Sequence, residues 1–180
     1  MPAGAPWSSR WTSGSAASPQ APTPARTGWR SVAEPTGRRS LPAAPAPQGH
    51  YVPVVVHAGT AYTAGMTPRV DGRLAVCGRV GEDLNVVEAR AAAGLAAGNA
   101  VAAVAEAVGG LDRVRRCLRL TVYVACRPDF TQHSMVADGA SEVLRDWLGE
   151  RGSVARSAVG VSSLPSGAPV EVELTVAVAD

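Results

Sequence analysis

The sequence predicts a single α+β domain in which two helices pack on one face of a β-sheet. Its 180 residues suit one domain with room for a core. Val114–Ala125 and Val170–Val178 show apolar residues with the period of two that is typical of strands. Two stretches that follow Asn85 and Pro128 carry apolar residues at helical spacing. The predicted order is β-β-(β)-α-β-α-β-β, and the uncovered face of the sheet favours an oligomer.

Composition divides the chain into a tail and a domain. Residues 1–48 hold nine of the fourteen prolines and show no helix or strand periodicity. We therefore expect a disordered Pro/Ala-rich tail over residues 1–40 and the folded domain over residues 41–180. The tail has no apolar stretch typical of a secretory signal. Arg38-Arg39 does not predict twin-arginine export, because prolines at 42, 45 and 47 stand where the apolar region would be.

Charge and residue usage exclude several classes of function. All 17 basic residues are arginine, so no lysine is available to form a Schiff base with pyridoxal phosphate. Residues 1–48 carry a formal charge of +4, which leaves residues 49–180 at −2, and an acidic domain argues against nucleic acid as the partner. Cys77, Cys117 and Cys126 have no Cys-x-x-Cys spacing, so we expect neither a disulfide nor a metal site, in keeping with a reducing cytoplasm.

The first half of the domain predicts a hairpin, a short strand and a long helix. Val52–Ala58 and Thr60–Ala64 are expected to pair around Gly59, and a short strand is expected over Leu74–Cys77 after an Asp-Gly turn. Asn85 stands three residues before Glu88, a capping-box pattern that begins a helix. This helix should end near Val108, before two glycines, and its many alanines predict close packing on the sheet.

The second half predicts a central strand and a second helix. Alternation over Val114–Ala125 places Leu118 on the apolar face and Cys117 on the other face, together with Arg115, Arg119, Thr121 and Tyr123. That second face suits contact with another subunit. The following helix should turn an apolar stripe inward and stop at Gly149; the stripe comprises Val136, Ala140, Val143, Leu144 and Trp147.

The last two strands, Val154–Val161 and Val170–Val178, carry the candidate chemistry. Arg156, Ala158 and Gly160 share one face of the first strand, so a guanidinium lies beside two very small residues. A charged group next to such a shallow surface suits a small anionic ligand. In the second strand Glu171 and Glu173 share the polar face. The alternative, which spacing alone favours, is an exposed arginine and two solvated glutamates on an antiparallel sheet.

The segment Ala-Arg-Ser-Ala-Val-Gly-Val, followed by Leu-Pro and Val-Glu-Val-Glu, closely resembles the C-terminal signature of the RidA/YjgF family. This family is also called endoribonuclease L-PSP or chorismate-mutase-like. The resemblance covers roughly residues 41–180 and includes Leu41-Pro42, Gly49–Pro53, Gly78–Leu84, Asn99, Leu111–Val114, Leu120–Val124 and Asp138–Ser141. It implies a YjgF-like fold with a mixed β-sheet and a homotrimer with three clefts between subunits. Because it begins only near Leu41, a start codon assigned too far upstream is favoured over a partner-binding tail.

The resemblance also implies site residues. Arg156 would hold the substrate carboxylate, and Glu171 would position water, although a structural acid paired to an arginine is the alternative for Glu171. Tyr51 would lie near the cleft mouth or, equally, pack on the hairpin. Gly65 would offer main-chain donors, but Ala64-Gly65-Met66 replaces a common Ser-Gly-Gln. Ala158 stands where relatives often carry cysteine, and Gly160 replaces an acid found in many of them.

The expected function is hydrolysis of 2-imino or 2-enamino acids to 2-oxo acids and ammonia by a soluble cytoplasmic trimer. The expected partner is a small carboxylate-bearing substrate, with no cofactor, metal, nucleic acid or membrane. A non-catalytic small-ligand binder is the alternative, favoured by Ala64 and Ala158. Endoribonuclease activity is less expected, because the domain is acidic.

Overall fold

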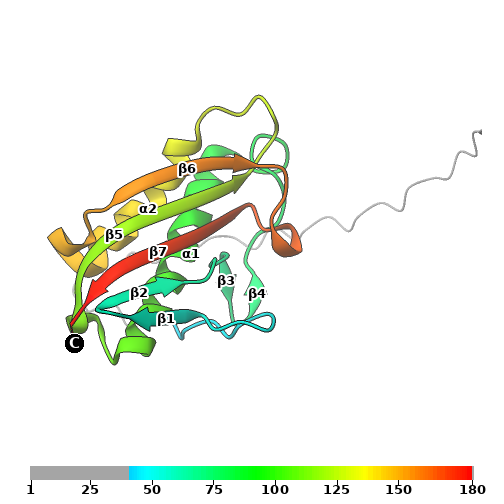
Figure 1. Ribbon diagram of the computed structural model, residues 1–180. Coiled ribbons are helices and arrows are strands. Elements are labelled where there is room, and N and C mark those ends of the chain that lie inside the picture. Colours follow the sequence, from blue (N-terminus) through cyan, green and yellow to red (C-terminus); the bar gives the residue numbers. More distant parts are fainter. Residues whose placement is uncertain (1–40, 180) are drawn as a thin grey trace, which may run out of the picture. The chain divides into compact units, whose positions relative to one another are not determined.

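The computed structural model describes residues 41–179, so the expectations for the tail lie outside the described residues. A five-stranded mixed sheet of order β1-β2-β7-β5-β6 carries both helices on one face (Figure 1). The predicted α+β class and the position of both helices are confirmed. We call the covered side of the sheet the helix face and the other side the open face. The bounds are β1 Val54–His57, β2 Thr60–Thr63, α1 Val86–Val108, β5 Val114–Ala125, α2 His133–Leu148, β6 Ala155–Val161 and β7 Val170–Val178.

Two short hairpins lie before α1. The β1–β2 turn has positive φ at Ala58 and Gly59, the geometry whose twist suits a two-residue hairpin. The short strand expected over Leu74–Cys77 does follow the Asp-Gly turn, but it comprises Arg73–Leu74 (β4), which pair with Arg69–Val70 (β3). This pair forms a separate two-stranded sheet.

Helix α1 begins and ends where its sequence predicts. The Asn85 side chain accepts a hydrogen bond from the Glu88 N–H at 3.0 Å, and the Glu88 carboxylate accepts one from the Asn85 N–H at 2.9 Å. The helix stops at Gly109, whose φ of 84° is left-handed. Although α1 is long and apolar enough to cross a membrane, 67% of its most apolar window is buried, so it is a core helix of this fold.

Strand β5 departs from simple alternation near its start. Register shifts with β7 fall between Val114 and Arg116 and between Cys117 and Arg119. Because a bulge places an extra residue in one strand, it changes which face the following side chains occupy. Cys117 is therefore buried at 1% exposure and Leu118 is 43% exposed, so the face expected for these two residues is wrong.

Strands β6 and β7 lie on opposite sides of β5. Strand β6 pairs parallel to β5, with Arg156 opposite Leu120 and Ala158 opposite Val122. Strand β7 pairs antiparallel, with Glu171 opposite Tyr123. Since directly paired residues share a face, Arg156 lies on the helix face with buried Leu120, and Glu171 lies on the open face.

Candidate functional site

Arg156 is held against α2 by three hydrogen bonds. Its Nη1 donates to Asp138 Oδ1 and to Ser141 Oγ, both at 2.9 Å, and its Nη2 donates to the Ser134 carbonyl at 3.4 Å. The side chain is only 21% exposed. Asp138 also lies 3.8 Å from Arg90, which pairs with Glu142. We call Arg156, Ser134, Asp138 and Ser141 the Arg156 cluster.

One edge of this guanidinium is left for a ligand. Arginine has five N–H donors, and both donors of Nη1 are engaged within the Arg156 cluster. In the described part of the chain, Nε–H has no hydrogen-bond acceptor and Nη2 has only the long contact to Ser134. The Nε–Nη2 edge has the fork geometry that matches the two oxygens of a carboxylate.

The strand surface next to the Arg156 guanidinium, at Ala158 and Gly160, is only partly open to a ligand. Ala158 packs against the core with a small methyl side chain. A Cβ added at Gly160 would lie 2.5 Å from His133 Nε2 and 3.2 Å from Cys126 Sγ. A side chain at position 160 would therefore run into the His133 imidazole, and Gly160 and His133 line the same cavity.

His133 borders a cavity of about 430 Å³ at the end of the sheet where β6 finishes with Gly160 and Val161. Its Nε2 lies 3.5 Å from Cys126 Sγ, and its ring meets Phe130 edge-to-face with centroids 5.1 Å apart. Burial raises the pKa of the Cys126 thiol, an effect that Arg79 opposes. The lining residues are Arg79, Cys126, Arg127, Pro128, Phe130, His133, Gly160, Val161 and Ser162.

A second group of residues, the Glu171 cluster, lies on the open-face side and comprises Gly65, Tyr123, Glu171 and Glu173. A Cβ at Gly65 would lie 1.7 Å from Glu171 Oε1, so only glycine allows this approach. Met66 and Val172 exchange two backbone hydrogen bonds of 2.8 Å, which fix the segment there. Burial and the nearby Glu173 carboxylate raise the pKa of Glu171. Tyr123 donates to Glu173 at 3.0 Å.

The structure does not bring all the predicted site residues together. Arg156 and Ala158 share the helix face, whereas Gly65 and Glu171 meet on the open-face side. Tyr51 is exposed, and its hydroxyl accepts from the Gln48 N–H at 3.1 Å. Among residues 41–179, no hydrogen bond joins Tyr51 to either cluster. One chain alone therefore cannot present Arg156 and Glu171 to the same small substrate.

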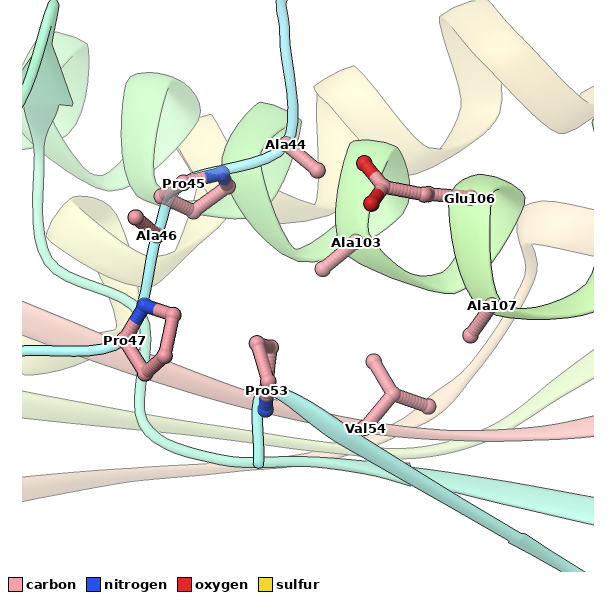
Figure 2. Close-up of a pocket in the computed structure, with 9 residues that line it drawn as sticks. All are labelled: Ala44, Pro45, Ala46, Pro47, Pro53, Val54, Ala103, Glu106 and Ala107. Carbon is pink, nitrogen blue, oxygen red and sulfur yellow. The ribbon is translucent and has the colours of Figure 1, made fainter. Parts of the chain in front are cut away.

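Another hollow of about 490 Å³ lies between the segment before β1 and the C-terminal half of α1 (Figure 2). Its walls are mostly alanine, proline and valine, and its one ionisable side chain is Glu106, which would repel a carboxylate. Within residues 41–179, no group of three or more His, Cys, Asp or Glu is arranged to hold a metal ion. The Arg156 cluster is thus the better site for a small acid.

Comparisons with known proteins agree with this fold. A family model described as "YjgF/chorismate_mutase-like, putative endoribonuclease" matches residues 32–174. Protein TCP17 of Trypanosoma cruzi is 42% identical over 137 residues, which cover 76% of this chain and 86% of that protein.

Two solved structures are also similar. The protein Atu1372 from Agrobacterium tumefaciens, of unknown function, is 40% identical with a TM-score of 0.71, over 72% of this chain and 82% of that one. A Shewanella oneidensis protein described as a "putative endoribonuclease" is 30% identical with a TM-score of 0.74, over 77% and 92% of the two chains. With a family model matched over most of its length, the chain belongs to the YjgF/chorismate-mutase-like family.

Proposed function

We propose that this protein hydrolyses 2-imino or 2-enamino acids to 2-oxo acids and ammonia. The observation that carries the proposal is Arg156, which is mostly buried, is fixed on one side by Asp138 and Ser141, and keeps its Nε–Nη2 edge for a ligand. A charge-assisted pair of hydrogen bonds at that edge would orient the substrate carboxylate. Positioning of this kind supports catalysis because it removes orientational freedom before the reaction.

Glu171 is proposed to orient the attacking water. Burial and Glu173 raise its pKa, a direction that favours a proton acceptor working closer to neutral pH. In the described part of the chain the Gly65 N–H beside it donates to no group, so it is available to a substrate or a water.

A site with both Arg156 and Glu171 requires two copies of the chain. We therefore propose a homotrimer with the sites in clefts between subunits, as the family resemblance implies. The open face supports assembly, because it exposes apolar side chains that no described helix covers: Val55, Tyr62, Leu118 and Val159. A reducing cytoplasm is the proposed location, since the described cysteines are all free.

A non-catalytic binder of small carboxylates is the second candidate. It is favoured by Ala64 and Ala158, which bring neither a hydroxyl nor a thiol to the two clusters. Such a binder would hold the carboxylate at the same Nε–Nη2 edge of Arg156. It would bind 2-oxo acids without accelerating the hydrolysis of imino acids. The net negative charge of residues 49–180 gives least support to an RNA substrate.

The test couples an amino-acid oxidase, which generates the imino acid, to a trapping reagent that competes with hydrolysis. Arg156→Ala should lower kcat/KM by about 30- to 5,000-fold, which corresponds to about 2–5 kcal/mol for a truncated charge-assisted contact. Arg73→Ala is the control, because Arg73 is an exposed arginine of the small β3–β4 hairpin. Equal activity of wild type and Arg156→Ala would refute the carboxylate role. Binding of a 2-oxo acid with no acceleration of hydrolysis would favour the binder.

A further inference from the structure

The imidazole of His133 lies on the same face of the sheet as Arg156. Gly160 pairs with Val124, which is fully buried under the helices, and a side chain at position 160 would run into His133 Nε2. Arg156, Ala158 and Gly160 follow one another along this face, because alternate residues of a strand point the same way. His133 and the Arg156 guanidinium therefore flank Ala158.

The backbone of α2 connects the two groups directly. Ser134, whose carbonyl accepts from Arg156 Nη2 at 3.4 Å, is the residue after His133. The first turn of one helix thus fixes both the imidazole and the free edge of the guanidinium. A small 2-imino acid whose carboxylate lies on that edge could extend past Ala158 toward His133, which borders the cavity of about 430 Å³.

His133 is oriented on two sides. Phe130 packs edge-to-face against the ring at 5.1 Å, and Cys126 Sγ lies 3.5 Å from Nε2. Burial raises the pKa of the Cys126 thiol, so at neutral pH the sulfur keeps its proton. The imidazole is then the member of this pair that can both accept and donate a proton through its two ring nitrogens.

We propose that His133 is the proton-transfer residue for hydrolysis at Arg156, an inference that rests on the proposed deaminase function. In the reaction one water adds its oxygen to the imine carbon. The carbon–nitrogen bond then breaks with its electron pair on nitrogen, and a 2-oxo acid and ammonia form. Both protons of the water end on nitrogen, so two protons must pass from oxygen to nitrogen. While Glu171 orients the water, His133 takes the first proton from it as the carbon–oxygen bond forms and passes that proton to the imine nitrogen. It then takes the second proton from the hydroxyl of the tetrahedral intermediate and gives it to the same nitrogen, which leaves as ammonia as the carbon–oxygen double bond forms.

The experiment compares full-length wild type with His133→Ala in the oxidase-coupled assay. The expected result is a fall in kcat of about 10²- to 10⁴-fold with KM changed by less than about threefold, because the carboxylate contact at Arg156 is retained. Added imidazole should restore part of kcat to His133→Ala and leave Arg156→Ala unchanged. His57→Ala is the matched control, because His57 is an exposed histidine at the end of β1.

The outcomes separate this inference from the proposed function. If wild type hydrolyses imino acids and His133→Ala keeps kcat within about threefold, the inference is overturned and the deaminase function stands. Loss of kcat that imidazole does not restore also overturns it, since a purely structural role gives that result. If wild type does not accelerate hydrolysis, both ideas fail. Should His133→Ala lack a native melting curve, His133→Gln is measured instead under the same limit on kcat.

Discussion

Asp138 already pairs with the Arg156 guanidinium, so a bound substrate carboxylate would be a second negative charge on the same group. The variant Asp138→Asn removes the first of these charges. Asparagine keeps an oxygen that can accept from Arg156 Nη1, where Asp138 Oδ1 now accepts at 2.9 Å, but it removes a negative charge. Without that charge the guanidinium is less neutralised. We therefore expect Asp138→Asn to bind a 2-oxo acid more tightly than wild type.

The size of the gain follows from the geometry of the guanidinium. Carboxylates on opposite edges lie about 8 Å apart, where two unit charges repel by about 0.5 kcal/mol in water and about 2 kcal/mol at an effective dielectric constant of about 20. Asp138 is 47% exposed, so solvent screening places the value near the lower limit. A gain of about 0.5–1 kcal/mol corresponds to a Kd lower by about two- to fivefold.

Isothermal titration calorimetry with a 2-oxo acid tests this, at low and at high salt, because screening should shrink the gain. Ser141→Ala is the control, since it removes a hydrogen bond to the same Nη1 without changing charge, and it should not tighten binding. A Kd for Asp138→Asn raised more than about tenfold would refute the reasoning. It would show that the Asp138 charge is needed to hold Arg156 in place.

Three further predictions concern stability and assembly. The raised pKa of Glu171 in the folded state means that the folded protein is more stable when this side chain is protonated. This contribution to stability is fully present below the ordinary carboxyl pKa and is lost as pH rises through the folded pKa. Glu171→Gln should therefore have a higher Tm than wild type at neutral pH, with the difference closing in acid, and an equal Tm at all pH values would contradict this. Leu120→Ala should cost about 2–5 kcal/mol in urea unfolding, whereas Leu118→Ala should cost less than about 1 kcal/mol, and equal losses would disprove the bulged register of β5. Light scattering should give three times 18.4 kDa, and a clean monomer would remove the proposed cleft.

Elements with local signals were predictable from the sequence. The Asn85–Glu88 capping box and Gly109 determine the two ends of α1, because caps act within a few residues of the chain. The hairpin turn at Gly59 and the length of β5 also depend on neighbouring residues. These features need no knowledge of distant contacts.

The parts that failed depend on pairing between distant segments. Alternation placed Cys117 and Leu118 on the wrong faces, because a bulge arises from the register of β5 against β7 and leaves no local mark. Arg156 was identified by its resemblance, but its face depends on the parallel pairing of β6 with β5. His133 was missed because its neighbours, Cys126 and Gly160, come from other parts of the chain.

The placement of Arg156 and Glu171 on opposite faces of one sheet has a genetic consequence. In an assembly whose clefts take Arg156 from one copy and Glu171 from the next, each chain contributes half of two different sites. Arg156→Ala and Glu171→Gln chains would each have low activity as pure assemblies. When the two are refolded together, some clefts receive both intact residues, so the two alleles complement each other. A double variant that carries both changes on one chain could not complement itself.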